Sequence, residues 1–265
     1  MSESLLMIAG VALPVLGASI IAVLGKWPNV RDGATLVIAA STFAIVYQLY
    51  IQVKIGLRPT LHILDLTSNL TLSFHIEPLG MLFALVASSL WILTLLYAIG
   101  YMRGHHEKNQ TRFFSFFSIA IAAAIGAAFS GNMLTLFFFY ELLTLSTYPL
   151  VTHHRNPASL KAGRIYMGIL LSTSIGFLLL AIVLTYIFAG NLSFTPGGIL
   201  TGKTSDLMTG ILLLLYAYGT GKAALMPIHS WLPNAMVAPT PVSALLHAVA
   251  VVKTGVFTIV KVVIY

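Results

Sequence analysis

The sequence contains no cysteine. This absence excludes a disulfide framework, a thiolate metal site and an iron–sulfur cluster within the chain. Charge is also scarce, because only 8% of the 265 residues are charged, whereas soluble domains carry about a quarter. With 58% apolar residues, the composition excludes a soluble globular protein and predicts an all-α integral membrane protein. We expect no cofactor and no metal here, so any redox centre would lie elsewhere.

Long apolar runs predict about eight transmembrane helices, since about 20 apolar residues cross the hydrocarbon core of a bilayer. The first run follows Met-Ser-Glu instead of a basic segment and lacks a small-residue cleavage pattern. We therefore expect a transmembrane helix there and not a signal peptide. The runs cover residues 5–24, 33–53, 78–101, 113–129, 133–151, 165–189, 207–227 and 241–263.

Between the second and third runs, apolar and polar side chains alternate over residues 61–75, with an interruption at Ser68-Asn69. Alternation with a period of two is typical of a β-strand. We predict a short β-hairpin outside the membrane, near residues 59–76. An irregular loop is the alternative.

Lysine and arginine are unevenly distributed among the loops, and short basic loops remain in the cytoplasm. The loops after the first, third and fifth predicted helices hold Lys26, Arg31, Arg103, Lys108, Arg112, Arg155, Lys161 and Arg164. The other loops and the C-terminal end hold Lys54, Arg58, Lys203 and Lys261. This asymmetry predicts that both termini lie on the outer face. The net charge of +7 therefore reports topology and not nucleic-acid binding.

Few ionisable side chains remain at membrane depth, namely Glu141, Lys222, His229, His247 and Lys253. A charge at the bilayer centre costs at least ~2.5–3.5 kcal/mol, so such residues usually face the inside of a bundle and mark an ion or proton path. The structural alternative is a carboxylate neutralised by protonation or by a lysine, with histidines satisfied in the core. Of the two histidines, His247 is the stronger relay candidate and His229 the weaker.

Glu141 lies near the middle of the predicted helix 133–151. Thr144 and Tyr148 share its helical face and could hydrogen-bond to the carboxylate or hold water. The adjacent histidines at positions 105–106 and 153–154 lie outside the predicted helices, and we expect them in solvated loops or subunit contacts.

Lys222 follows two glycines and precedes Pro227, so the helix that carries it is expected to be interrupted. A broken helix leaves backbone groups that protein or water must satisfy. We predict an ion pair between Glu141 and Lys222. Its opening and closing would change the proton affinity of Lys222, which would exchange protons with His247 and Lys253 through water.

The motifs themselves resemble a known family. The segment HSWLPNAMVAPTPVSALLH, from His229 to His247, and the following VKTGV from Val252 resemble the signature of the antiporter-like subunits. Such subunits occur in complex I, in Mrp-type cation/proton antiporters and in membrane-bound hydrogenases. The pair Gly221-Lys222, the run FYELLTLSTYPLV from Phe139, and the Tyr101-Met-Arg103 segment before Arg112-Phe-Phe agree as well. The resemblance extends over about residues 75 to 260.

In that family a glutamate on the fifth helix pairs with a lysine on a broken seventh helix, and a histidine and a lysine on the eighth continue a hydrated chain. The matching residues here are Glu141, Lys222, His247 and Lys253. The resemblance implies an N-terminus outside. It also implies one inverted-repeat five-helix unit (helices 4–8) in residues 113–265, preceded by helices 1–3 and the hairpin in residues 1–112. Family members usually contain a second, inverted repeat, so a partner chain is expected to supply it.

The sequence therefore predicts a proton-translocating subunit, with or without linked Na⁺ antiport. It would belong to a larger NADH:quinone oxidoreductase-like or antiporter complex in the bacterial inner membrane. The expected partners are the other membrane subunits of that complex. The alternative is a non-conducting structural or energy-coupling membrane subunit, for example of an inorganic-carbon uptake system.

Overall fold

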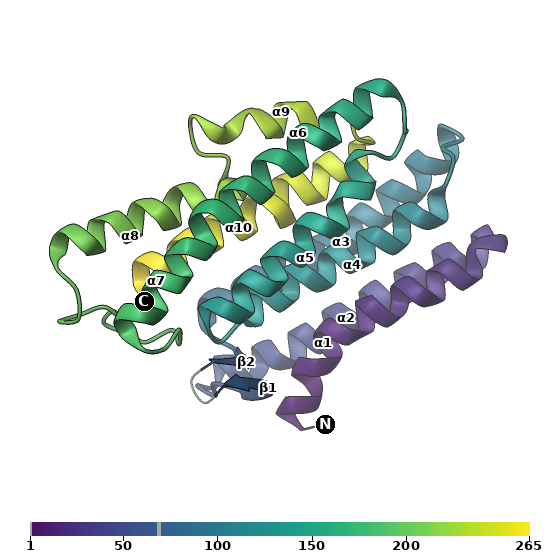
Figure 1. Ribbon diagram of the computed structural model, residues 1–265. Helices are drawn as coiled ribbons and strands as arrows, with labels where there is room; N and C mark the ends of the chain where they lie inside the picture. Colours follow the sequence, from purple (N-terminus) through teal and green to yellow (C-terminus); the bar gives the residue numbers. More distant parts are fainter. Residues whose placement is uncertain (1, 68–69) are drawn as a thin grey trace.

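The computed structural model describes residues 2–67 and 70–265, and the side chains of residues 245–248 are outside that description. Ser68-Asn69 and the His247 side chain therefore lie outside the described residues. Within them, seven helices are long and apolar enough to cross a membrane (Figure 1). These are α1 (Glu3–Val23), α2 (Pro28–Lys54), α3 (Pro78–Gly104), α4 (Gln110–Phe129), α5 (Met133–Val151), α6 with α7 (Pro157–Ala189) and η5 with α10 (Val242–Ile264).

Two of these long helices are compound. The first joins α6 (Pro157–Thr173), the π-helical segment η2 (Ser174–Leu178) and α7 (Leu179–Ala189), and the second joins the π-helical η5 (Val242–Val251) to α10 (Val252–Ile264). The remaining short elements are η1 (Leu24–Lys26), α8 (Asp206–Gly219), η3 (Gly221–Ala223), η4 (Ile228–Ser230) and α9 (Trp231–Ala235). The all-α membrane class is confirmed. The predicted helix at 207–227 is the shorter, interrupted α8.

Capping side chains set where several helices begin. The side chains of Ser2, Asn132, Asn156 and Ser205 each accept a hydrogen bond from a backbone N–H in the first turn of the helix that follows, which satisfies a donor that has no partner inside the helix. Because Asn156 caps α6, that helix begins at Pro157, earlier than the predicted start at residue 165.

The predicted hairpin is confirmed as two antiparallel strands, β1 (Thr60–Thr67) and β2 (Leu70–His75). It is fixed to the bundle at the start of α5, where Asn132 Nδ2 donates to Thr71 O at 2.7 Å and Thr135 Oγ1 accepts from Ser73 N at 3.0 Å. We call the end of the bundle that carries β1, β2 and both described chain ends the hairpin end (Figure 1). The opposite end, with loops 105–109 and 152–156, is the basic end.

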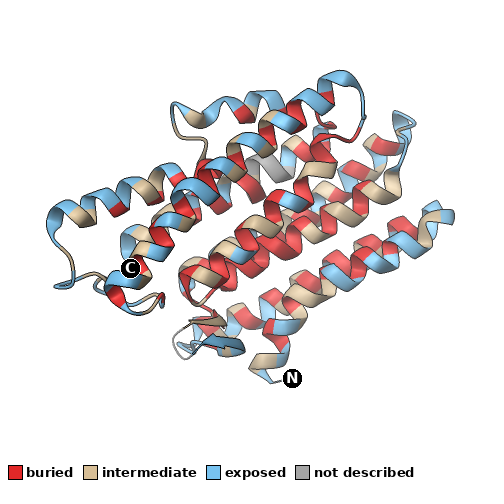
Figure 2. Cartoon of the chain, viewed as in Figure 1, coloured by how far each residue is buried: buried red, intermediate tan, exposed pale blue. Residues whose placement is uncertain are grey.

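The core centres on α4, which packs against α1, α3 and α5. Figure 2 shows buried residues along α4 and α5. Small residues allow this close packing of helices. A Cβ added at Gly126, for example, would lie 2.3 Å from Phe139 of α5. Since α4 joins both halves of the bundle, no gap in packing marks the proposed boundary between residues 112 and 113, and that division stays a prediction.

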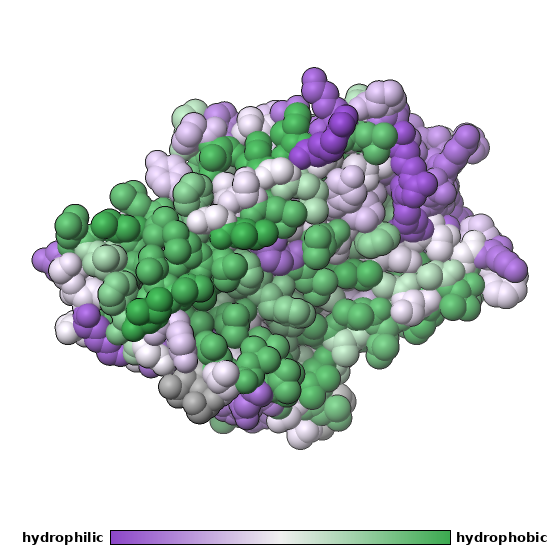
Figure 3. All heavy atoms as spheres, viewed as in Figure 1, coloured by the Kyte–Doolittle hydropathy of each residue, from purple (hydrophilic) through white to green (hydrophobic). Residues whose placement is uncertain are grey.

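The outer surface is mostly apolar. Apolar side chains cover most of the face in view, and hydrophilic side chains gather toward its right and upper edges (Figure 3). This distribution fits a bundle whose sides contact lipid and whose ends contact water.

Two charged residues at the basic end, Arg31 and Asp32, are buried, which corrects their sequence-based placement outside the helices. Both lie near the start of α2, with exposed fractions of 3% and 4%. Arg31 Nε donates to Asp32 Oδ1 at 2.8 Å, and Arg103 Nε of α3 donates to Asp32 Oδ2 at 2.8 Å. The burial is tolerable because the carboxylate is shared by two guanidinium groups. The contact ties the start of α2 to the end of α3.

Candidate functional site

The predicted interruption before Lys222 is present. The helix α8 ends at Gly219, η3 follows at Gly221–Ala223, and Ala224 adopts a left-handed backbone conformation with φ of 54°. The break packs directly on the π-helical segment η2, since a Cβ added at Gly219 would lie 2.3 Å from Leu178 N. Glycine is required at this approach because the neighbouring atom belongs to the backbone.

Lys222 is completely buried, with an exposed fraction of 0%. Its Nζ donates to Tyr140 O at 2.6 Å and to Thr144 Oγ1 at 2.6 Å, both on α5. The same Nζ lies 3.1 Å from the centroid of the Tyr140 ring, and the backbone N of Lys222 donates to Tyr140 Oη at 3.1 Å. The broken helix therefore places one desolvated ammonium group against a single turn of α5.

Glu141 is the neighbouring acid, and its carboxylate is poorly satisfied. Both oxygens are buried, and no described group donates a hydrogen bond to them. The ion pairs formed by described residues do not include Glu141, although its charge acts on Lys222. The predicted direct pair is thus not formed in this arrangement. Lys222 binds Tyr140 O and Thr144 Oγ1, whereas position 141 is rotated about 100° from position 140 and about 60° from position 144.

Aromatic residues that the sequence analysis did not select complete the site. Trp231 Nε1 of α9 donates to Gly221 O at 2.9 Å, and the same carbonyl accepts from Ala224 N at 3.0 Å. The Trp231 ring meets Tyr166 of α6 edge to face, with centroids 5.5 Å apart, and Tyr166 Oη hydrogen-bonds to Thr147 Oγ1. Trp231 lies inside the HSWLPNA motif, so that motif was the available signal.

The other predicted relay residues are placed differently. Lys253 is exposed on α10, and His229 is exposed in η4 beyond the break. His247 belongs to η5, and its side chain lies outside the described residues. Of the five predicted site residues, the structure therefore brings Glu141 and Lys222 close to each other.

A second buried ion pair was missed at sequence level. Lys261, counted above with the C-terminal end, lies inside α10 with an exposed fraction of 0%, and its Nζ is 3.3 Å from Glu77 Oε2. Glu77 immediately precedes α3 and is also buried. The sequence analysis placed neither residue among the charges at membrane depth, because burial there depends on how α10 packs against the start of α3.

One loop histidine also departs from its prediction, because His153 is buried and not solvated. Desolvation, together with the nearby charge of Arg112, lowers the pKa of His153 to about 4. The ring is then neutral near pH 7, so its 3.9 Å contact with Glu107 is not an ion pair there. Among the described residues, no group of three or more His, Cys, Asp or Glu residues could hold a metal ion.

Comparisons with known proteins agree with this fold. The profile of the family described as NADH:quinone oxidoreductase/Mrp antiporter, TM matches residues 130–265. A second profile, NADH-Ubiquinone oxidoreductase (complex I), chain 5 N-terminus, matches residues 65–114. The first match includes the broken helix with Lys222 and also the segment of α5 to which Lys222 hydrogen-bonds.

Individual relatives come from two kinds of complex. The chain is 31% identical over 205 residues to NAD(P)H-quinone oxidoreductase subunit 5 of the Chara vulgaris chloroplast, a match that covers 73% of this chain and 30% of the relative. It is 30% identical over 197 residues to the antiporter subunit mnhA2 of Staphylococcus haemolyticus, covering 73% of this chain and 24% of the relative. The matched region thus spans about a quarter to a third of these relatives.

Two solved structures share the fold with a TM-score of 0.81 each. One is a chain of the membrane-bound sulfane sulfur reductase, an archaeal respiratory membrane complex. It is 20% identical, and the match covers 99% of this chain and 41% of that one. The other is a chain of the Mrp complex from Dietzia sp. DQ12-45-1b, at 22% identity, covering 95% of this chain and 27% of that one. At these identities the likeness shows the fold alone.

The fold and the site define a multi-pass membrane protein in which an interrupted helix presents a buried lysine to its neighbour. With the matched profiles, the chain belongs to the NADH:quinone oxidoreductase/Mrp antiporter transmembrane family.

Proposed function

We propose that this chain translocates protons as a membrane subunit of a larger antiporter or quinone-oxidoreductase-type complex. The observation that carries the proposal is the fully buried Lys222 at a helix break, beside the unsatisfied carboxylate of Glu141. Ionisable groups are costly inside a membrane, and they persist where an ion or proton passes. The family relationship supports the same function.

The mechanism is electrostatic. An ammonium group at Lys222 keeps two hydrogen bonds to α5, to Tyr140 O and Thr144 Oγ1, and Glu141 is the next residue after Tyr140. When the carboxylate moves away or takes up a proton, its attraction for the ammonium is lost and Lys222 releases its proton more readily. A conformational change that shifts Glu141 therefore drives proton transfer, because it changes the relative populations of the two protonation states.

We assign the continuation of the relay to His247 and Lys253. Lys253 is exposed on α10, and an uncovered charge at membrane depth costs at least ~2.5–3.5 kcal/mol. We propose that another membrane subunit covers this face, as a second inverted repeat would, and receives the proton there. The proposal places the chain in a bacterial inner membrane with its N-terminus outside. Na⁺ is the candidate for a second transported ion.

Replacing Glu141 with glutamine is expected to reduce coupled proton transport by about 100-fold, within the range for removing a group that transfers or controls a proton. The amide keeps the shape of the carboxylate and removes its charge. Transport is measured as acidification of inverted membrane vesicles that contain the whole complex. Glu3→Gln, in the first turn of α1, is the matched control and should transport at the unaltered rate.

Equal rates in the two glutamine variants, with equal amounts of assembled complex, would contradict the relay. That result would favour the alternative function of a non-conducting structural subunit.

The partner on the Lys253 face can be captured through a single cysteine, because the native chain has none. Val256 is 41% exposed and lies three residues beyond Lys253 on α10, so both occupy one helical face. We expect Val256→Cys to cross-link to another membrane subunit of the purified complex. Leu16→Cys is the control, because Leu16 is 62% exposed on the lipid-facing side of α1. Labelling of Val256→Cys by lipid-phase reagents alone would overturn the covered-face proposal.

A further inference from the structure

The buried ion pair at the hairpin end extends into a chain of three ionisable groups. Lys261 Nζ of α10 lies 3.3 Å from Glu77 Oε2 and donates to Ser130 O at 3.0 Å. On the other side, His75 Nε2 at the end of β2 lies 3.8 Å from Glu77 Oε1. The carboxylate of Glu77 therefore stands between a lysine and a histidine that come from different elements.

The three side chains differ in how far water reaches them. The exposed fractions are 35% for the His75 side chain, 8% for that of Glu77 and 0% for that of Lys261. This order leads from the outside of the protein into its interior. A buried ion pair is weak evidence for stability, since apolar residues of similar volume often stabilise a protein equally well. A graded series of proton-binding groups is, by contrast, what passage of a proton requires.

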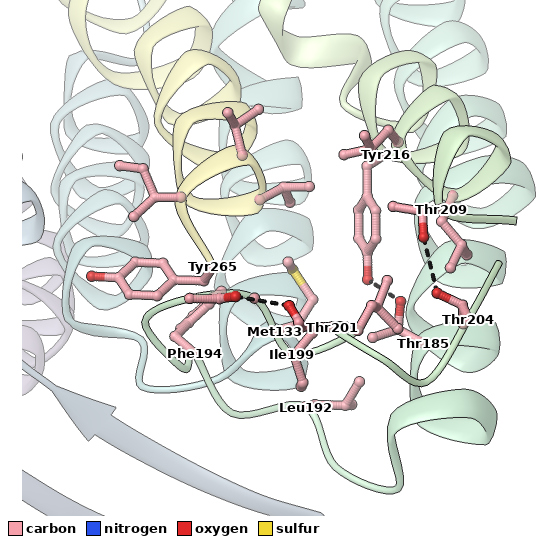
Figure 4. Close-up of a pocket in the computed structure, with 18 of the residues that line it drawn as sticks. Met133, Thr185, Leu192, Phe194, Ile199, Thr201, Thr204, Thr209, Tyr216 and Tyr265 are labelled. Atoms are coloured by element: carbon pink, nitrogen blue, oxygen red, sulfur yellow. Dashed lines mark hydrogen bonds between the residues drawn. The ribbon is translucent and has the colours of Figure 1, made fainter. Parts of the chain in front are cut away.

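The surroundings of Lys261 are aromatic. Its Nζ lies 3.9 Å from the ring centroid of Phe194 and 5.8 Å from that of Tyr265. These two residues also line a cavity of about 610 Å³ at the hairpin end (Figure 4). Among the described residues, Arg58 interacts electrostatically with His75. Tyr265 interacts electrostatically with both Arg58 and Glu77.

A buried polar stripe on α10 extends from this cluster toward the level of the broken helix, and its threonine hydroxyls donate to backbone carbonyls of the same helical segment. Thr254, Thr258 and Lys261 are all fully buried, and their spacing places them on one face of the helix over a rise of about 10 Å. Beside Thr254, at the next position of the chain, a Cβ added at Gly255 would lie 2.6 Å from the carbonyl carbon of Lys222. Gly255 is turned about 120° from Lys261 around the helix axis, so α10 contacts the Lys222 backbone on one side and carries the buried Lys261 on another, while Lys253 is exposed.

We propose that His75, Glu77 and Lys261 form a second proton-exchange site, which connects Lys222 with the aqueous phase at the hairpin end. The inference rests on the proposed function and deepens it, because it adds the point at which the proton path opens to water at the hairpin end.

Each transfer conserves protons. The ammonium of Lys261 gives one proton to the carboxylate of Glu77, which leaves a neutral amine and a carboxylic acid. The acid passes that proton to the neutral imidazole of His75, which releases it to water, and the amine takes up the next proton from the Lys222 side. Partial burial lowers the pKa of His75, with Lys261 acting in the same direction and Glu77 against it, so the imidazolium releases its proton readily.

The test removes both charges together. In the Glu77→Gln/Lys261→Met double variant no unpaired charge stays buried, so the variant is expected to assemble. If the pair is purely structural, the double variant should transport protons at the native rate. If the pair belongs to an exchange site, the rate should be at least about tenfold below that of the native complex. The assay is vesicle acidification by the complete complex, and Lys203→Met, exposed at the same end, is the control.

A second variant keeps the test decisive if the double variant fails to assemble. His75→Gln changes a half-buried strand residue and should leave the complex intact. We expect a lower rate whose dependence on the pH at the hairpin end loses the titration due to an imidazole. A native rate and pH profile in His75→Gln, or a native rate in the assembled double variant, would overturn the second site.

The Glu141→Gln variant separates the two proposals. If it abolishes transport while the assembled double variant transports normally, only the second exchange site is wrong. If Glu141→Gln also transports normally, the proposed function is wrong as well.

Discussion

Replacement of Lys222 with methionine is expected to abolish proton transport, with a loss of more than about 100-fold. Lys222 is the fully buried cation of the broken helix, and it is held by Tyr140 O and Thr144 Oγ1. Methionine fills a similar volume and cannot bind a proton. The measurement is vesicle acidification normalised to the amount of assembled complex.

The same variant should remain folded. Thr144 Oγ1 already donates to Tyr140 O at 3.3 Å, so removal of the ammonium strands neither oxygen. The desolvation cost of a buried cation also disappears. We expect the thermal midpoint of the purified complex to stay within a few degrees of the native value, with Lys203→Met as the control. Substantial transport by Lys222→Met would exclude this lysine from the proton path.

Replacement of Gly255 with alanine is expected to damage both packing and transport. The added Cβ would lie 2.3 Å from Ala223 N and 2.6 Å from Lys222 C. Backbone atoms cannot rotate away as a side chain can, so η3 must shift. Overpacking of this kind typically costs about 1–3 kcal/mol. The shift moves Lys222 from its α5 partners, and transport should fall at least about tenfold, since small misplacements of reacting groups have large effects.

Gly168→Ala provides the matched control, because nothing lies within 4 Å of a Cβ added at that position of α6. Alanine favours a helix over glycine by about 0.8–1.0 kcal/mol, so this variant should be as stable as the native protein or slightly more so. Thermal unfolding and vesicle acidification of the two variants are compared side by side. Equal behaviour of Gly255→Ala and Gly168→Ala would show that contact with α10 does not position η3.

The fold was largely predictable because few backbone structures are stable inside a bilayer. Backbone groups in lipid must be satisfied internally, so long apolar runs become helices. The predicted helix 133–151 coincides with α5, and the predicted hairpin near 59–76 contains β1 and β2. The break before Lys222 was predictable for a local reason, since glycine and proline act on the helix in which they occur.

The partners of the charged side chains were not predictable in the same way. Sequence alone selected Glu141 and Lys222 as membrane-embedded charges, but the binding of Lys222 to Tyr140 O and Thr144 Oγ1 depends on the rotation of α5 about its axis. It also could not distinguish the exposed Lys253 from the buried Lys261, since both belong to one helix. The packing of α10 decides this, since Lys261 contacts Glu77 and Ser130 O while Lys253 remains exposed.

The sequence by itself determined the membrane class, the order of the helices and the location of the helix break, because hydropathy, glycine and proline act over short stretches of chain. Only the tertiary structure decided which charges are buried and what they touch. Asp32 forms ion pairs with Arg31 and Arg103, and Glu77 pairs with Lys261, which lies near the other end of the sequence. Such pairs join residues far apart in sequence, and their formation depends on how helices pack side by side.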